Sequence, residues 1–416
     1  MRHIRDASSP MWDDGDPRTL RRGLGQKEPT AGFVHPRSRP TAVETTAAWQ
    51  TPAVAGSKRL NVLTPRQLAI HLVREGLFSD EALVDGDLTI EVMPGRNYNH
   101  RITRRRGPNL LVKQSRDSSG ALAAEAAMYR VLQRRYGKDV AWYLPQLRLF
   151  DRRRRLLLLN LIVGSHTVAA HVAHHGRIGD HLADSLGRAV GALHRSGTRG
   201  KIRSTGIPWV LSLAHPPIEL LREISSANLQ MIRLLQESEA MCRGLDELAA
   251  SWREYCWIHN DLRWENCLVS KSGRAGPGLK LIDWELAGTG DPDWDIGAVF
   301  SSFLAAWIFS MRFVTGLTPE ALAKSARHPL ARFRPAIGTF WRAYVTSRGM
   351  SATAARESSV RAMRFAAARL VQFAFERQQD SSFVTGNVVC LIQMCANVMV
   401  RPELACSELL GLNLSE

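Results

Sequence analysis

The chain has 416 residues, of which 45% are hydrophobic and 23% are charged. This length and composition suffice for two or three lobes with cores of their own and exclude a fibrous or wholly disordered protein. The 55 Lys and Arg residues outnumber the 39 Asp and Glu residues, which gives a net charge of +16. Such a charge makes a strongly cationic substrate a poor first hypothesis and favours nucleic acid, an anionic membrane, a nucleotide or an acidic peptide as partner.

The cysteines and the apolar segments restrict the cellular setting. Six cysteines are dispersed without a CxxC pair, which is untypical of zinc ribbons and of secreted disulfide frameworks. The first residues lack the apolar core of a secretory signal. The most apolar run, residues 296–311, contains three serines and is shorter than the roughly 20 residues that span a bilayer. It predicts a buried helix, and we expect a cytoplasmic protein without a membrane span.

The N-terminal part of the chain contains a predicted disordered tail, followed by a predicted helix and a small predicted sheet. Residues 1–57 are rich in proline, glycine and mixed charge without apolar periodicity, and they predict a disordered tail. Thr64 and Pro65 are typical of a helix start, and an amphipathic helix follows them. Three short apolar segments with turns between them, at residues 88–93, 100–103 and 109–114, predict a small antiparallel sheet.

A helix over residues 120–136 and two further strands complete the predicted N-lobe. The strands, LPQLRLF and RLLLLNLIVG, flank a charged turn at Asp151 and Arg152. We therefore assign residues 58–163 to a β-rich N-lobe with one principal helix.

From residue 164 to residue 416 the pattern predicts a helical C-lobe. It includes a helix at Asp180–Arg195, a long helical segment over residues 218–255 and a C-terminal helical extension over residues 316–414. One β-like stretch, residues 258–284, lies among these helices. In the helix over residues 351–378, an apolar stripe at heptad intervals predicts a side that faces the core rather than a partner. The fold class is α+β with two lobes.

Polar residues that can carry chemistry are concentrated in residues 257–297. Asp261 and Asn266 stand in a loop before an apolar strand, and Asp283 ends the next strand after a Gly- and Ser-rich turn. Phosphoryl transfer needs a carboxylate that accepts the proton of the attacking hydroxyl and oxygen ligands for magnesium. Asp261 is the candidate base, and Asn266 and Asp283 are the candidate metal ligands. Each of these residues taken alone is more often a turn or cap residue.

Three further residues support the same chemistry. Lys113 ends an apolar strand in a chain with 47 Arg and only 8 Lys, and a compact ammonium suits the phosphates of a nucleotide. Glu125 is the sole glutamate between Lys113 and Asp139, and from the following helix it can pair with the lysine. A surface ion pair is the alternative for these two residues. His259 is expected to brace the loop by hydrogen bonds, since Asp261 already provides a base.

The order strand-Lys, helix-Glu, H-x-D-x-x-x-x-N and strand-D resembles the aminoglycoside phosphotransferase and choline kinase branch of the protein-kinase-like fold. The segment IDWELAGTGDPDWDIG over residues 282–297 is similar to the segment that this branch has in place of the Asp-Phe-Gly motif of protein kinases. The resemblance implies a bilobal kinase-like fold and an enzyme that uses ATP and Mg²⁺ to phosphorylate a hydroxyl group. It implies that Asp295 braces the catalytic loop from the next helix, and it gives functional roles to Lys113, Glu125, Asp261, Asn266 and Asp283.

Two positions depart from that branch. Asn260 stands where the family usually has glycine, and Asn tolerates the left-handed conformation better than most residues. The turn that would cover the phosphates holds one glycine, and its candidate nucleotide-binding residues are Gly95, Arg96 and Asn97. The hinge that would bind adenine through its backbone is expected at Asn160, Leu161, Ile162 and Val163.

A finer resemblance concerns the acceptor. The segments RNYNH, RWENCLV, AARLVQFAFE and TGNVVCLIQ are similar to the kinase subunits of class V lanthipeptide and thioamitide pathways. This implies phosphorylation of Ser or Thr in a ribosomal precursor peptide, followed by phosphate elimination by a separate lyase. The basic C-terminal helices favour an acidic peptide over a polycationic aminoglycoside. They carry Arg342, Arg348, Arg356, Arg361, Arg364 and Arg369.

Alternatives stay open at this point. A small-molecule kinase is the main one, and a pseudokinase scaffold is disfavoured because the lysine, base and metal ligands are all present. DNA binding is not expected, since no groove-reading motif accompanies the basic runs at residues 104–106 and 152–155.

Overall fold

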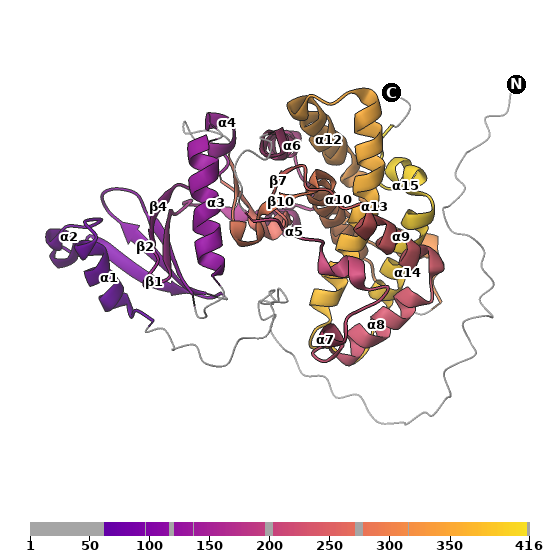
Figure 1. Cartoon of the computed structure of the whole chain (residues 1–416), viewed down its shortest axis with the longest axis horizontal. Coiled ribbons are helices and arrows are strands. Elements are labelled where there is room, and N and C mark those ends of the chain that lie inside the picture. Colours follow the sequence, from indigo (N-terminus) through magenta and orange to yellow (C-terminus); the bar gives the residue numbers. More distant parts are fainter. Residues whose placement is uncertain are drawn as a thin grey trace, which may run out of the picture.

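The computed structural model describes residues 62–95, 97–115, 120–135, 137–195, 203–270, 278–314 and 316–413. The predicted tail, residues 1–57, lies outside the described residues. The described chain forms two lobes, a sheet-based N-lobe and a larger helical C-lobe (Figure 1). This arrangement confirms the predicted α+β, kinase-like architecture.

The N-lobe is a five-stranded antiparallel sheet between helices, with strand order β1-β2-β3-β5-β4. Its strands are β1 (Leu88–Met93), β2 (Tyr98–Arg104), β3 (Leu110–Gln114), β4 (Leu147–Asp151) and β5 (Leu156–Asn160). Its helices are α1 (Pro65–Arg74), α2 (Asp80–Val84), α3 (Ala121–Arg135) and α4 (Gly137–Ala141). As predicted, Thr64 caps α1: its hydroxyl accepts from the Gln67 amide, and the Gln67 side chain accepts from the Thr64 amide.

Alternation along the strands divides the sheet between two cores. Leu156 and Leu158 of β5 pack with residues of α1, whereas Leu157 and Leu159 join the core that contains α3 and the C-lobe. In β3, Val112 belongs to the first of these cores. Its neighbour Lys113 therefore points to the opposite face, toward α3 and the C-lobe.

The C-lobe is mainly helical. Its helices are α5 (Val168–His175), α6 (Asp180–Arg195), α7 (Ile218–Leu221), α8 (Ser226–Gln236), α9 (Glu239–Ala250), α10 (Pro292–Ile308), α11 (Pro319–Lys324), α12 (Arg334–Arg348), α13 (Ala352–Arg377), α14 (Gly386–Val400) and α15 (Pro402–Glu408). Short 3-10 helices are η2 (Trp209–Ser212), η3 (Trp264–Asn266), η4 (Trp284–Leu286) and η5 (Leu330–Arg332). The predicted buried helix is α10, and its side chains are almost all buried.

Two small antiparallel sheets flank the loops that contain the candidate site residues Asp261, Asn266 and Asp283. The first contains β6 (His166–Thr167), β8 (Cys267–Val269) and β9 (Leu279–Leu281); the second pairs β7 (Cys256–Ile258) with β10 (Gly288–Gly290). The predicted hairpin is therefore present as β8 and β9. Strand β10 was not predicted, because its sequence Gly-Thr-Gly has little strand propensity.

Two other sequence predictions can be compared with the helices. The segment over residues 218–255 is divided into α7, α8 and α9, because Ser225 and Ser238 each cap the start of a new helix. The apolar stripe of α13 is confirmed as a core side, with Met363, Ala367 and Leu370 fully buried.

Helices α10 and α13 lie side by side in the C-lobe (Figure 1). Their close approach depends on Gly297 of α10. A Cβ atom at this position would lie 2.7 Å from the Cβ of Phe365 and 2.9 Å from both the Ala362 carbonyl oxygen and the Ala366 amide nitrogen. Because two of these atoms belong to the backbone of α13, they cannot move aside without a shift of the helix.

We expect Gly297→Ala to lower the free energy of unfolding by about 1–3 kcal/mol, the usual effect of overpacking a close-packed core. The measurement is urea denaturation. Gly338→Ala in α12 is the matched control, since a Cβ there would meet only the end of the Arg342 side chain, at 3.3 Å. That variant should be neutral or stabilising by up to about 1 kcal/mol, the helix propensity gain of alanine. Equal effects at the two positions would contradict the packing argument.

Among the described residues, no single helix is long and apolar enough to cross a membrane. Helices α14 and α15 meet the length and composition criteria only when taken together, and they are bent by 117° at their junction.

Candidate active site

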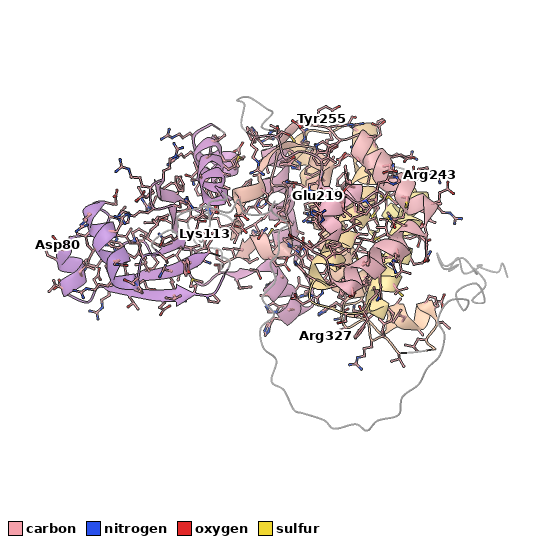
Figure 2. The ribbon with its side chains drawn as sticks, turned by 60° about the horizontal axis from the view of Figure 1, so that its bottom comes forward. Asp80, Lys113, Glu219, Arg243, Tyr255 and Arg327 are labelled. Atoms are coloured by element: carbon pink, nitrogen blue, oxygen red, sulfur yellow. The ribbon has the colours of Figure 1, made fainter. Side chains whose placement is uncertain are left out.

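Lys113 is held between two carboxylates at the junction of the lobes. Its Nζ atom lies 3.0 Å from Oε1 and 3.1 Å from Oε2 of Glu125, and 3.0 Å from Oδ1 of Asp283. Figure 2 shows the lysine on the side of the N-lobe that faces the C-lobe. The pairing of Lys113 of β3 with Glu125 of α3 was predicted from the sequence, whereas its contact with Asp283, at the end of the β8–β9 hairpin, was not.

The two carboxylates keep the lysine charged. Burial disfavours the ammonium form, but the Asp283 and Glu125 carboxylates outweigh this effect and raise the pKa of Lys113 above its ordinary value. Glu125 has no exposed side-chain surface, whereas 38% of the Asp283 side chain is exposed. Asp283 can therefore contact a ligand in the cleft while Glu125 only orients the lysine.

The loop that contains the candidate base is held by Asp295 of α10. Its two carboxylate oxygens accept from the backbone amides of His259, at 2.7 Å, and Asn260, at 2.9 Å. The His194 Nε2 atom lies 3.3 Å from the same carboxylate, and both side chains are fully buried. Asn260 has a φ of 67°, so the loop takes the left-handed conformation that the family's glycine would allow and that Asn tolerates.

His259 connects the loop to the strand that precedes Asp283. Its Nε2 atom is 2.9 Å from the Ile282 carbonyl oxygen, and its Nδ1 atom is 3.4 Å from the Asp261 amide nitrogen. The Ile282 amide in turn donates to the Asn266 carbonyl oxygen at 3.0 Å. These bonds place Asp261, Asn266 and Asp283 in one site. They agree with the expected bracing position of His259.

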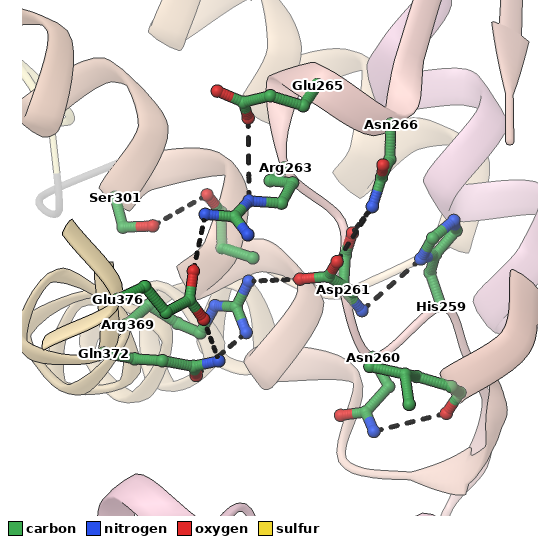
Figure 3. Close-up of polar contacts among 12 residues, drawn as sticks. His259, Asn260, Asp261, Arg263, Glu265, Asn266, Ser301, Arg369, Gln372 and Glu376 are labelled. Carbon is green, nitrogen blue, oxygen red and sulfur yellow. Dashed lines mark hydrogen bonds and ion pairs between the residues drawn. The ribbon is translucent and has the colours of Figure 1, made fainter. Parts of the chain in front are cut away.

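Asp261 is held by two side chains. Its Oδ2 atom accepts from Asn266 Nδ2 at 2.9 Å, and its Oδ1 atom accepts from Arg369 Nη2 at 3.0 Å (Figure 3). Burial favours the neutral acid, but the Arg263 and Arg369 guanidiniums outweigh it and hold the pKa of Asp261 below its ordinary value. The carboxylate is thus ionised at neutral pH, as a proton acceptor must be.

The donor set fits a magnesium ion. Asn266 uses its Nδ2 atom to donate to Asp261, both to the backbone carbonyl at 2.8 Å and to the side chain, so its amide oxygen is directed elsewhere. Asp283 uses Oδ1 for Lys113, and within the described part of the chain its Oδ2 atom has no hydrogen-bond partner. Carboxylate and amide oxygens are the hard ligands that Mg²⁺ prefers.

The structure describes the predicted nucleotide-binding turn only in part, and some backbone amides of the predicted hinge already have partners within the protein. Gly95 and Asn97 lie in the β1–β2 turn, and Arg96 lies outside the described residues. At the hinge, the Asn160 amide donates to the Gln146 carbonyl and the Leu161 amide to the Asn109 carbonyl. These two amides are therefore engaged within the N-lobe.

The rest of the hinge is freer to meet an adenine. Ile162 accepts from Ser165 through its carbonyl oxygen, and Val163 is 66% exposed. Of the four hinge amides, only those of Ile162 and Val163 lack a protein acceptor among the described contacts.

A network of polar side chains that the sequence analysis did not identify extends from Asp261 (Figure 3). Arg369 Nη1 donates to Gln372 at 3.1 Å, and Gln372 donates to Glu376 at 3.0 Å. Glu376 then accepts from Arg263 Nη2 at 2.9 Å. The available signal was the spacing of residues 369, 372 and 376, which places three polar side chains on one side of the C-terminal half of α13.

Several arginines of the C-terminal helices form ion pairs within the protein. Arg361 lies 2.6 Å from Asp291, Arg364 lies 2.5 Å from Glu247, and Arg369 contacts Asp261. From the sequence, we expected six arginines of these helices to favour an acidic partner. Three of the six instead neutralise acidic residues of the chain itself and contribute less positive charge to the surface.

Comparison with known proteins identifies related sequences and folds. The model of the phosphotransferase enzyme family matches residues 94–335. A choline kinase from Streptococcus pneumoniae is 15% identical, with 79% of this chain and 99% of that chain covered and a TM-score of 0.42. A putative fructosamine-3-kinase from Thermobifida fusca is 18% identical, with 76% and 93% covered and a TM-score of 0.45. A choline/ethanolamine kinase family protein from Mesorhizobium loti is 16% identical, with 81% and 98% covered and a TM-score of 0.45. No curated protein gives a significant match.

Proposed function

Because this chain belongs to the phosphotransferase enzyme family, we propose that it transfers the γ-phosphate of ATP, with Mg²⁺, to the hydroxyl group of Ser or Thr in a ribosomal precursor peptide. The observation that carries the phosphotransferase activity is the position of Lys113 between Glu125 and Asp283, in the same site as Asp261 and Asn266. These are the groups that phosphoryl transfer requires: a phosphate-binding cation, a proton acceptor and oxygen ligands.

Each residue has a distinct task in this proposal. Lys113, oriented by Glu125, binds the phosphates of the nucleotide. Asp261 accepts the proton of the acceptor hydroxyl as its oxygen attacks the γ-phosphorus atom, and the bond from that phosphorus to the ADP oxygen breaks. Asn266 and Asp283 would hold the metal, which when bound neutralises charge on the phosphates. His259 and Asp295 keep the loop in place and touch neither reactant.

The peptide acceptor rests on the resemblance of four sequence segments to kinase subunits of class V lanthipeptide and thioamitide pathways. In that role the product is a phosphopeptide, and a separate lyase removes the phosphate to leave a dehydroamino acid. A cytoplasmic location and an acidic precursor peptide belong to the same proposal.

A small-molecule acceptor is the alternative. A cavity of about 220 Å³ adjoins the network at Asp261, and its size suits a small alcohol as well as a single side chain. A pseudokinase is disfavoured, because the lysine, its glutamate partner and the candidate base and metal ligands come together in space.

The two acceptor classes are separated by incubating the protein with ATP and Mg²⁺ and one acceptor at a time. The acceptors are a Ser- and Thr-containing peptide with acidic flanks, an aminoglycoside and choline, and mass spectrometry detects a phosphate adduct. We expect the adduct on the peptide only, and none when EDTA replaces Mg²⁺. Phosphorylation of the aminoglycoside or choline alone would overturn the peptide acceptor, and no adduct on any hydroxyl would count against the kinase activity.

A further inference from the structure

The cavity beside the catalytic loop is formed by three helices and the loop itself. Helix α5 contributes Ala169 and Val172, α10 contributes Ala305 and the residue that caps its C-terminus, Phe309, and α13 contributes Phe373 to its apolar walls. The polar wall is the network that leads to the base, and it comprises Arg263, Glu265, Arg369, Gln372 and Glu376. Arg369 therefore both lines the cavity and contacts Asp261. An acceptor that approaches Asp261 from this cavity passes this guanidinium.

The carboxylates of the cavity wall are already paired. Glu376 accepts from Arg263 with one oxygen and from Gln372 with the other. Glu265 lies 3.6 Å from the Nε atom of Arg263. An amine bound by this wall would lie beside the Arg263 guanidinium, which already contacts both carboxylates, so like-charge repulsion disfavours an ammonium group there.

The aromatic faces are paired as well. The guanidinium of Arg377 lies 5.0 Å from the ring centre of Phe309, and those of Arg377 and Arg263 lie 5.6 Å and 5.8 Å from that of Phe373. A quaternary ammonium is bound by open aromatic faces. Because arginines already lie over these two rings, the cavity is unsuited to such a cation.

Hydrogen-bond donors, in contrast, are in excess. A guanidinium has five N–H groups, and within the described part of the chain Arg369 donates to Asp261 through Nη2 and to Gln372 through Nη1. Its side chain is only 7% exposed and lies over the ring of Trp294, which fixes its orientation. The remaining N–H groups are suited to an uncharged oxygen acceptor such as a peptide carbonyl.

We propose that Arg369 is a specificity-determining residue of the acceptor site: it binds a carbonyl oxygen next to the acceptor hydroxyl and excludes cationic acceptors. The site then takes a seryl or threonyl residue whose neighbours carry no positive charge. This inference rests on the proposed peptide kinase activity. It adds a residue of α13 to the site, and residue 369 lies beyond the segment matched by the family model, which ends at residue 335.

The test uses the full-length protein and two synthetic peptides. One is acetyl-Ala-Leu-Ser-Leu-Ala-amide, and the other has lysine in place of both leucines. Values of kcat and KM are measured with saturating ATP and Mg²⁺ for the wild type, Arg369→Gln, Arg369→Lys and Arg356→Gln. The last variant is the matched control, because Arg356 is an exposed arginine of the same helix.

The wild type should use the lysine peptide at least about tenfold less efficiently than the neutral one, the effect of one uncompensated like-charge contact. Arg369→Gln should raise KM for the neutral peptide about tenfold, the loss of one hydrogen bond to a charged group, with a smaller change in kcat. The same variant should use the two peptides with similar kcat/KM. Arg369→Lys keeps the positive charge, so it should still use the lysine-containing peptide less efficiently than the neutral one. Arg356→Gln should behave as the wild type.

The outcomes separate this inference from the proposed function. If the wild type phosphorylates neither peptide, the peptide acceptor fails and the role of Arg369 fails with it. If the wild type phosphorylates the neutral peptide but Arg369→Gln keeps both KM and the discrimination, only the role of Arg369 is overturned. Thermal unfolding and ATP binding show whether each variant is folded. If Arg369→Gln does not fold, the lysine variant and the wild-type preference between peptides still decide the question.

Discussion

Asp261→Asn should reduce the rate of phosphate transfer by about 10²- to 10⁴-fold, the usual contribution of a positioned general base. The amide has the shape of the carboxylate but cannot accept the proton of the attacking hydroxyl. It also places an N–H₂ group against either Asn266 Nδ2 or Arg369 Nη2, since both of these atoms donate to Asp261. Lys113, Glu125 and Asp283 are unchanged, so binding of ATP should stay within about threefold of the wild type, less than the loss of one hydrogen bond.

Turnover is measured as phosphopeptide formation by mass spectrometry, and ATP binding by calorimetry. Asp246→Asn is the control, because it makes the same chemical change at an exposed position on α9. Asp261→Asn turnover equal to that of the control would exclude Asp261 as the base. Loss of ATP binding together with turnover would indicate that the variant disturbs the nucleotide site instead.

Asp295→Ala should lower the free energy of unfolding by about 3–5 kcal/mol, the usual effect of removing one member of a buried charged network. The carboxylate accepts from the backbone amides of His259 and Asn260 and contacts His194. Without it, these buried donors lose their acceptor. Because the same bonds fix the loop that carries Asp261, turnover should fall as well, even at temperatures where the variant is folded.

Urea denaturation gives the stability of this variant, and turnover is measured well below its midpoint. Asp180→Ala serves as control, since Asp180 is an exposed residue in the first turn of α6. Asp295→Asn should have an intermediate effect, because one oxygen still accepts while the amide nitrogen opposes a donor. A loss of stability no larger than in the control would show that the loop is held by other contacts.

The sequence predicted that the candidate phosphate-binding and catalytic residues come together, because the signals that place them are local. Strand alternation next to Val112 directs Lys113 to the cleft, and the short hairpin after Asn266 returns the chain to Asp283. Asn260 was recognised as a residue that tolerates the left-handed conformation, and it has a φ of 67°. Each of these features depends on residues within one strand, turn or hairpin.

Local sequence signals were insufficient to predict which hinge amides are free and which arginines are paired. The sequence placed the hinge at residues 160–163, but the bonds from Asn160 and Leu161 to Gln146 and Asn109 depend on how the strands pair. Net charge suggested a basic surface on the C-terminal helices. Pairing of Arg361 with Asp291 and of Arg364 with Glu247 could not be read from a residue count, because it joins residues 70 and 117 positions apart.

The sequence by itself therefore determined the α+β fold class, the family through its motifs, and the candidate residues Lys113, Glu125, Asp261, Asn266 and Asp283, since spacing, periodicity and capping are short-range properties of a chain. Only the tertiary structure decided what surrounds the acceptor side of Asp261. Arg369 is 108 residues away from Asp261 in sequence, and it reaches the base because α13 packs against α10 where Gly297 has no side chain. That contact depends on the packing of two helices, and no local pattern in either helix specifies it.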